Sequence, residues 1–247
     1  MVIDNRSREF DAISTASVSA LCHRKFGVGS DGLMLVHGAE DADFEMVFFN
    51  PDGSKSLCGN GSRCAVVFAE GLGLAGEKGS FITTDGRHDY RLRDNREVAV
   101  QMRPVGPQRS VRGHLFLHTG SPHLVVLTDD VDAVDVVETG ARLRHLPEFE
   151  KTGGTNVNFV ARMDEHSIGV RTFERGVERE TLSCGTGVTA AALALAADVS
   201  APQNFKVHTH GGVLRVRFRK TTEGFDDIWL EGPAQKVFSG EIDLNDA

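Results

Sequence analysis

Two short segments of the chain place a cysteine directly before a glycine-bounded triplet and an apolar stretch. Residues 57–64 read "LCGNGSRC" and residues 182–197 read "LSCGTGVTAAALALAA". A cysteine at a helix start lies beside backbone N–H groups without intrahelical partners and beside the positive end of the helix dipole, and both favour the thiolate. Cys58 and Cys184 are therefore candidate acid/base thiols, and the N–H groups that follow them are candidate carboxylate ligands.

Two such thiols suit the inversion of a carbon that bears hydrogen. One group removes the proton from one face of the carbon, and the other delivers a proton to the opposite face. Amides that hold the substrate carboxylate also stabilise the enolate-like charge that develops there. The alternative is that each cysteine is a small buried hydrophobe, as single cysteines commonly are. The occurrence of two matching motifs favours chemistry.

The elements around these motifs indicate an α+β protein that is rich in antiparallel strands. Short alternating or β-branched runs predict strands at 33–37, 44–49, 80–84, 97–103, 123–128, 157–163, 167–173 and 212–219. Helices are expected near 17–25, 61–72, 134–145 and 186–198. The second and fourth of these are apolar nearly all round, which is typical of a helix buried on every side. Cys64 and Cys22 are both expected in the core.

Composition limits the class of protein. The 247 residues are 40% hydrophobic, which is enough for a buried core in one large domain or two of ordinary size. Without an apolar run of about 20 residues or a signal segment, we expect a cytoplasmic protein with no membrane contact. The formal net charge is −8 and no basic block is present, which argues against nucleic acid and favours a small-molecule substrate.

The cysteine spacing argues against both a disulfide framework and a metal site. The chain has four cysteines, Cys58 and Cys64 are six residues apart, and the histidines are scattered. We therefore expect reduced thiols and no metal.

The two motifs lie in different halves of the chain, which suggests a duplicated unit. Proline, glycine and charge at 103–112 predict a boundary there. We expect an N-terminal half at 1–107, joined by about the last ten residues, and a C-terminal half at 108–247.

Taken together, the motifs resemble the diaminopimelate epimerase family, whose members interconvert L,L- and meso-diaminopimelate without a cofactor. The matching segments keep the family's order: "FGVGSDGLML" (26–35), "FFNPDGSKSLCGNGSRC" (48–64), "GSPH" (120–123), "GTNVNFV" (154–160) and "FERGVERETLSCGTGVTAAA" (173–192). The resemblance implies two pseudo-symmetric domains, each a mostly antiparallel strand barrel around a buried central helix, with the substrate in the cleft between them. It also implies a homodimer and a role in lysine and peptidoglycan precursor biosynthesis.

The resemblance assigns roles to single residues. It makes Cys58 and Cys184 the acid/base pair. The expected ligands of the reacting α-carboxylate are Gly59, Asn60, Gly185 and Thr186, through their helix-start amides. His123 and Glu174 are expected beside the thiols and the reacting amino group. The expected ligands of the distal end are Asn50, Asn156 and Arg175, with Ser121 where the family often has asparagine; Arg175 suits a carboxylate because it presents a fork of donors.

Several of these residues also have simpler explanations. Asn50 in "NPDG" fits a turn, His123 after Pro122 fits an ordinary strand start, and the Glu174–Arg175 pair fits an exposed charged turn. Two other functions are open: a proline or hydroxyproline racemase of the same fold, and a catalytically impaired homologue that acts as a binding protein. Asn50, Asn156 and Arg175 are the expected ligands of a second amino-acid head group, which diaminopimelate has and proline lacks. They therefore favour diaminopimelate as the substrate.

The chain departs from the family pattern in two further places. Family members have about a dozen residues before the equivalent of "MVIDNR", with an edge strand and an asparagine ligand, so we expect a start codon assigned too late. Glu178 and Arg179 stand where many members have one glycine. We expect a loop variant there that leaves the chemistry unchanged.

Overall fold

The computed structural model describes residues 1–93, 95–196 and 202–242. The chain divides into two compact units, Met1–Val100 with Pro233–Ala247, and Gln101–Gly232. The predicted assignment of one epimerase half to 1–107 and the other to 108–247 stays a prediction.

The first unit is a sheet whose inner face packs on helix α2 (Gly59–Gly71). Its strands lie in the order β1 (Val2–Asp4), β2 (Leu33–His37), β3 (Phe44–Phe49), β4 (Lys78–Thr83), β5 (Gly86–Leu92) and β6 (Glu97–Gln101). Alternate residues of these strands, such as Phe44 and Phe81, form a core with Ala65 and Ala69 of the helix. Helix α1 (Thr15–Cys22) packs on a second cluster that includes Leu33 and Leu35 of β2.

Helix α2 is not buried on every side, so that expectation was wrong. Helical periodicity turns Ala65, Val66 and Ala69 toward the strands and leaves Cys64 and Glu70 exposed. The prediction that Cys64 belongs to the core was therefore wrong, whereas Cys22 is buried as expected.

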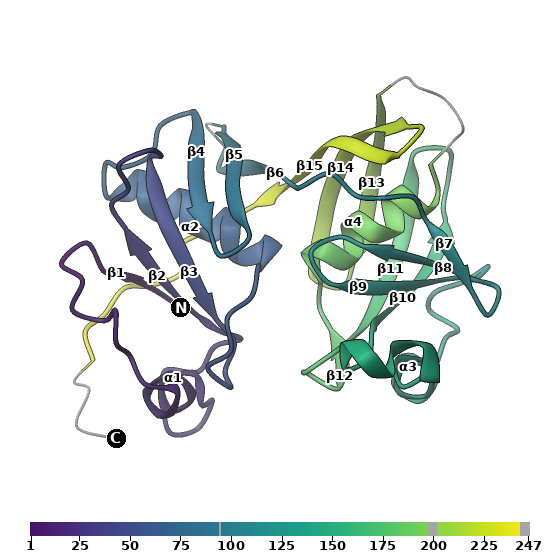
Figure 1. Cartoon of the computed structure of the whole chain (residues 1–247), viewed down its shortest axis with the longest axis horizontal. Helices are drawn as coiled ribbons and strands as arrows, with labels where there is room; N and C mark the ends of the chain where they lie inside the picture. Colours follow the sequence, from purple (N-terminus) through teal and green to yellow (C-terminus); the bar gives the residue numbers. More distant parts are fainter. Residues whose placement is uncertain (94, 197–201, 243–247) are drawn as a thin grey trace. The chain divides into compact units, whose positions relative to one another are not determined.

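The second unit contains the remaining strands of the sheet, and most of its neighbouring strands are antiparallel. The order is β15 (Gly224–Pro233), β14 (Gly212–Thr221), β13 (Gln203–Thr209), β11 (Ser167–Glu174), β10 (Asn156–Arg162), β9 (Pro122–Leu127), β8 (His114–His118) and β7 (Arg109–Val111), and β12 (Arg179–Thr181) pairs with β11. The pairs β9–β10 and β11–β13 are parallel. The structure contains many strands and few helices, which confirms the predicted α+β class (Figure 1).

Helix α4 (Gly185–Ala194) is buried along its whole length, as its sequence predicts. It contacts strands β8 to β11 and also β13 and β14 (Figure 1). Its glycine, alanine and threonine side chains are small enough for strands to approach it from many directions. The helix was expected to continue to residue 198, but it ends at Ala194 with Leu195 as its C-cap residue, so that expectation was too long; residues 197 and 198 lie outside the described part of the chain.

The other face of this sheet is covered by α3 (Val136–Arg144) and the 3₁₀ helix η1 (Pro147–Thr152). Along β10, Val157 and Phe159 join the α3 core. Because side chains alternate across a strand, Asn156 and Asn158 point to the α4 side. This alternation brings polar side chains to the start of α4.

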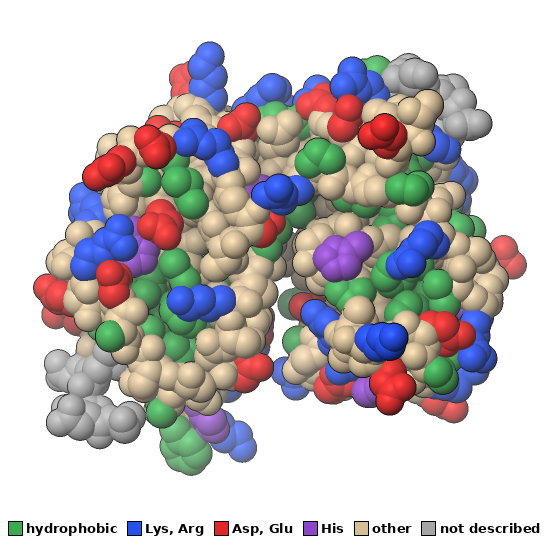
Figure 2. Space-filling model, viewed as in Figure 1, with side chains coloured by type: hydrophobic (Ala, Val, Ile, Leu, Met, Phe, Trp, Pro, Cys, Tyr) green, Lys and Arg blue, Asp and Glu red, His purple; other side chains and the backbone are tan. Residues whose placement is uncertain are grey.

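The surface carries both signs of charge. Figure 2 shows basic and acidic side chains interspersed over the face that it presents. Within residues 1–93, 95–196 and 202–242, no helix is long and apolar enough to cross a membrane.

Candidate active site

Cys58 and Cys184 occupy the same place in two helices. Each is the N-cap residue, with φ −122° and ψ 107° at Cys58 before α2 and φ −110° and ψ 112° at Cys184 before α4. The carbonyl of each accepts the first helical hydrogen bond, from Ser62 N–H and Val188 N–H, both at 2.8 Å. The helix-start position predicted for both cysteines is confirmed, and their catalytic role stays a prediction.

The surroundings of Cys58 come from the first turns of α2. Its Sγ accepts a hydrogen bond from Gly61 N–H at 3.3 Å. Arg63 folds back to this helix start, where its guanidinium donates to Gly59 O at 3.3 Å and to Asn60 Oδ1 at 2.8 Å. Arg63 is buried, and its Nε has no partner in the described chain. Burial lowers the pKa of Arg63, while its electrostatic attraction to the thiolate forms of Cys64 and Cys58 opposes that shift.

The surroundings of Cys184 are a cluster of hydroxyls and one imidazole. Its Sγ lies 3.5 Å from Thr186 Oγ1. His123 Nε2 lies 3.0 Å from Thr186 Oγ1 and 2.9 Å from Ser121 Oγ. The structure therefore brings four of the predicted site residues of the second unit into one hydrogen-bonded cluster.

His123 is fully buried in this cluster and uncharged at neutral pH. The pKa of His123 is lowered to about 3, mainly by burial and also by the positive charges of His118 and Arg175, although the hydrogen bond with Asn158 opposes them. A neutral imidazole has one donor and one acceptor nitrogen. His123 can therefore order the neighbouring hydroxyls without adding a positive charge.

Asn156 and Arg175 are joined, although they lie on different strands. Asn156 is buried; its Oδ1 accepts from the backbone N–H of Arg175 at 2.9 Å, and its Nδ2 donates to Pro122 O at 3.0 Å and Ser121 Oγ at 3.2 Å. Both the oxygen and the nitrogen of the Asn156 side-chain amide are thus hydrogen-bonded within the protein. The half-buried Arg175 side chain donates to Thr152 O at 2.7 Å through one terminal nitrogen.

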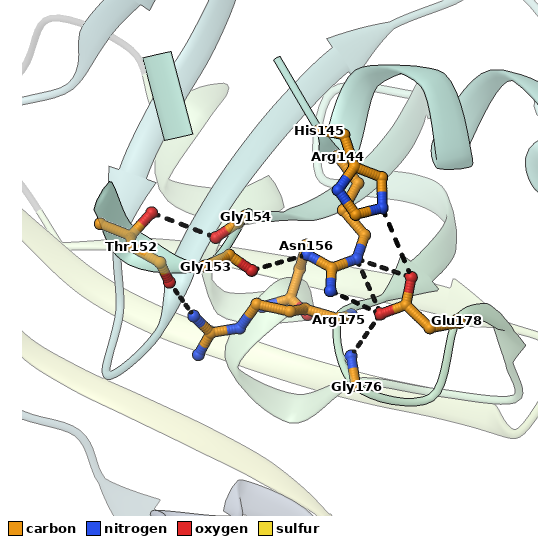
Figure 3. A network of polar contacts seen from close by, with 9 residues as sticks. All are labelled: Arg144, His145, Thr152, Gly153, Gly154, Asn156, Arg175, Gly176 and Glu178. Atoms are coloured by element: carbon orange, nitrogen blue, oxygen red, sulfur yellow. Dashed lines mark hydrogen bonds and ion pairs between the residues drawn. The ribbon is translucent and has the colours of Figure 1, made fainter. Parts of the chain in front are cut away.

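The loop that holds Arg175 is tied down by an ion pair between Arg144 and Glu178 (Figure 3). Arg144 Nε lies 2.7 Å from both carboxylate oxygens of Glu178, and Arg144 Nη1 donates to Gly153 O at 2.9 Å. Glu178 also accepts from Gly176 N–H at 2.8 Å. Glu178, one of the two residues expected where many family members have one glycine, thus links α3 to the loop after β11, and Arg144 also holds the loop before β10.

Glu174 forms a hydrogen bond with a neighbouring strand, and Asn50 forms hydrogen bonds within its own turn. Glu174 Oε2 accepts from Thr181 Oγ1 at 2.9 Å across β11 and β12. Asn50 follows β3 in the first unit, and its Nδ2 donates to Ser54 Oγ at 2.9 Å and Ser54 O at 3.2 Å. The turn explanation accounts for these contacts of Asn50, and its role as a ligand stays a prediction.

Sequence reasoning missed Arg63, Thr119, Asn158 and Thr172. Asn158 Nδ2 lies 3.1 Å from His123 Nδ1, and Thr172 Oγ1 donates to Asn158 Oδ1 at 3.0 Å. Thr119 Oγ1 donates to Thr186 O at 2.8 Å. Asn158 could have been found from the sequence "NVN", because residues two apart on a strand lie on the same face and Asn158 therefore shares a face with the predicted site residue Asn156. The described residues contain no cluster of three or more His, Cys, Asp or Glu side chains that could hold a metal.

Comparisons with known proteins cover almost the whole chain. The sequence model of the family described as "Diaminopimelate epimerase" matches residues 1–106 and 115–237. The chain is 41% identical over 244 residues to a protein of Flavobacterium psychrophilum named "Diaminopimelate epimerase", and the match covers 98% of this chain and 95% of that protein.

Two solved structures share the fold at low sequence identity. A phenazine biosynthesis protein of the PhzF family from Bacillus anthracis has a TM-score of 0.69 and 17% identity, and the match covers 94% of this chain and 89% of the other. A probable proline racemase from Agrobacterium radiobacter has a TM-score of 0.66 and 18% identity, over 92% of this chain and 80% of the other.

Proposed function

Because the chain belongs to the diaminopimelate epimerase family, we propose that it interconverts L,L- and meso-diaminopimelate by proton transfer between two cysteines. The family model covers both cysteine motifs, and the relative from Flavobacterium psychrophilum carries that enzyme's name. The product of this reaction would serve lysine and peptidoglycan precursor biosynthesis.

The observation that carries the proposal is the matched placement of Cys58 and Cys184 as N-cap residues with nearly equal backbone angles. In the proposed step one thiolate takes the proton from the substrate α-carbon, and the electron pair of that C–H bond delocalises into the carboxylate. The other thiol then gives its proton to the opposite face of the carbon. One cysteine ends as a thiol and the other as a thiolate, so the charges balance and the reverse reaction uses the same groups. Neither step calls for a cofactor.

We also propose ligands for the reacting amino-acid group of the substrate, most of them at the helix starts. We assign the backbone N–H groups of Gly59, Asn60, Gly185 and Thr186 to the α-carboxylate, because helix-start amides attract anions and stabilise the charge that develops there. The Glu174 carboxylate is suited to the ammonium group. Its bond from Thr181 Oγ1 fixes one of its oxygens on the strand pair β11–β12.

For the distal amino-acid group we assign the carboxylate to Arg175. Only one of its terminal nitrogens donates to Thr152 O, which leaves further guanidinium N–H groups for a forked pair with a carboxylate. Asn156 acts here through the Arg175 backbone, since both ends of its amide are bonded within the protein. Asn50 and Ser121 remain proposed ligands of the same end, and a homodimer remains a prediction from the family.

The test is epimerisation of L,L-diaminopimelate under reducing conditions, followed by chiral chromatography, with L-proline offered separately. Cys58→Ala and Cys184→Ala should each lower the rate about a hundredfold to ten-thousandfold, which is the usual contribution of an acid/base group. Arg175→Met should mainly raise KM. Turnover of proline alone would replace this proposal with a racemase, and absence of turnover with either substrate would favour the binding-protein alternative.

A further inference from the structure

Asn158 is buried at the centre of a row of polar side chains that crosses three strands beneath the start of α4. It lies on β10 directly opposite Thr172 of β11, and its side chain reaches His123 of β9. Asn158 has no exposed surface. A methyl group added at Gly187 of α4 would lie 2.3 Å from Asn158 Oδ1, so the helix packs directly on this amide.

The orientation of the Asn158 amide follows from its two outer partners. Its Nδ2 lies 3.3 Å from the backbone carbonyl of Leu124, which can only accept a hydrogen bond. Its Oδ1 accepts from the Thr172 hydroxyl at 3.0 Å. The end of the amide that faces His123 is therefore the nitrogen, which donates.

This orientation decides where His123 carries its proton. Asn158 Nδ2 lies 3.1 Å from His123 Nδ1, so Nδ1 must be the acceptor. Full burial keeps the imidazole neutral, and a neutral imidazole has one N–H group. That group must be Nε2–H.

The Nε2–H group in turn directs the hydroxyls above it. It lies within donating distance of Thr186 Oγ1, at 3.0 Å, and of Ser121 Oγ, at 2.9 Å. A Thr186 hydroxyl that accepts from Nε2–H has its own proton to give elsewhere, and Cys184 Sγ lies 3.5 Å away. Hydrogen-bond donation to a sulfur favours its thiolate form. With the other tautomer, Nε2 would accept the Thr186 proton and withdraw it from the sulfur.

We propose that Asn158 is a positioning residue that fixes the Nε2–H tautomer of His123 and thereby points the Thr186 hydroxyl proton at Cys184 Sγ. The catalytic use of Cys184 rests on the proposed function. The tautomer itself does not.

The first test is ¹⁵N NMR of the histidine-labelled full chain at neutral pH, with the His123 signals identified by their loss in His123→Gln. We expect a proton on Nε2 and a bare Nδ1. A proton on Nδ1, or on both nitrogens, would overturn the proposal. Since this measurement needs no turnover, an inactive enzyme would count against the proposed function and would leave the tautomer result standing.

The second test changes the donor to an acceptor with Asn158→Asp. We expect the His123 proton to move to Nδ1 and the alkylation of Cys184 by iodoacetamide to slow about tenfold to a hundredfold, the usual range for a lost hydrogen bond to a charged group. With diaminopimelate, kcat should fall by a similar factor while KM changes little. Unchanged alkylation in a variant with the reversed tautomer would contradict the proposal.

Two control variants separate positioning from general disruption. Thr172→Val removes a hydrogen bond from the same amide but leaves its nitrogen on Leu124 O, so the tautomer and the Cys184 reactivity should persist. Asn204→Asp adds the same charge at an exposed position of β13 and should behave as the wild type. An equal loss of Cys184 reactivity in Thr172→Val and Asn158→Asp would show disruption and overturn the proposal.

Discussion

Asn156 Oδ1 accepts a hydrogen bond of 2.9 Å from the backbone N–H of Arg175, so a buried side chain on β10 fixes the backbone from which the proposed distal ligand extends. The same amide donates to Pro122 O and to Ser121 Oγ. Three parts of the second unit are therefore held together by one side chain.

Asn156→Ala should raise KM for diaminopimelate about tenfold and lower the free energy of unfolding by about 1–3 kcal/mol, because buried partners lose their hydrogen bonds. Steady-state kinetics and chemical denaturation would measure the two effects. Asn204→Ala, at an exposed site on the same unit, is the control and should change neither. A variant that keeps the wild-type KM would show that Asn156 does not position Arg175.

Glu178→Gln should destabilise the protein by about 1 kcal/mol at neutral pH, a modest value because the Glu178 side chain is 46% exposed and solvent screens the pair. The side-chain hydrogen bonds of Arg144 lower the pKa of Glu178 below its ordinary 4.5, against the opposing effect of partial burial. A lowered carboxyl pKa means that this stabilisation is present above pH 4.5 and is lost as the pH falls through the folded value.

The melting temperatures of the wild type and Glu178→Gln should therefore differ at pH 7 and converge in acid. Glu223→Gln, an exposed carboxylate on the turn before β15, is the matched control. A difference that stays constant down to low pH would contradict the assigned ion pair.

Arg63→Met should slow the alkylation of Cys58 by iodoacetamide at neutral pH about tenfold, since a buried positive charge near a thiol lowers its pKa and one pKa unit corresponds to a factor of ten in thiolate. The exposed Cys64 should first be replaced by serine in both proteins, so that only one thiol in this peptide reacts. Peptide mapping by mass spectrometry gives the rate. Equal rates in the two proteins would show that Arg63 does not influence the thiol.

Gly140→Ala should lower the melting temperature, because the added methyl group would lie 2.4 Å from Phe173 Cβ and force α3 away from β11. Overpacking of this kind costs about 1–3 kcal/mol. Gly71→Ala is the matched control: it lies at the end of α2 with no atom within 4 Å of the added methyl group, so it should be neutral or slightly stabilising. Equal stability of Gly140→Ala and the wild type would mean that α3 packs less closely than described.

Strongly apolar segments were enough to predict part of the fold. The strands at 33–37 and 44–49 have the predicted bounds, and the buried helix α4 follows from a segment without a polar face. Strand β5 was missed because its inward residues include His88, whose imidazole pairs with Asp85 at 2.9 Å instead of adding an apolar residue to the pattern. Strand β15 was missed because Asp226 and Asp227 interrupt its apolar run.

The candidate site was less accessible to sequence reasoning than the cysteine motifs that led to it. Local chemistry suffices to place Cys58 and Cys184 at helix starts. The contact of Asn158 with His123 depends on the parallel pairing of β9 with β10, between residues far apart in the chain. The exposure of Cys64 depends on which side of α2 the strands cover, which the apolar run at residues 64–69 does not reveal.

The two-cysteine mechanism is tested most directly by the position of deuterium early in the reaction of L,L-diaminopimelate in D₂O. A thiol carries a single proton, so the proton taken by one cysteine can return only to the face it left, while the other cysteine delivers solvent deuterium to the opposite face. We predict that meso product carries deuterium at the inverted carbon while recovered L,L substrate keeps hydrogen. Deuterium in the recovered substrate at the same rate as in the product would point to a single exchanging base and would contradict the account.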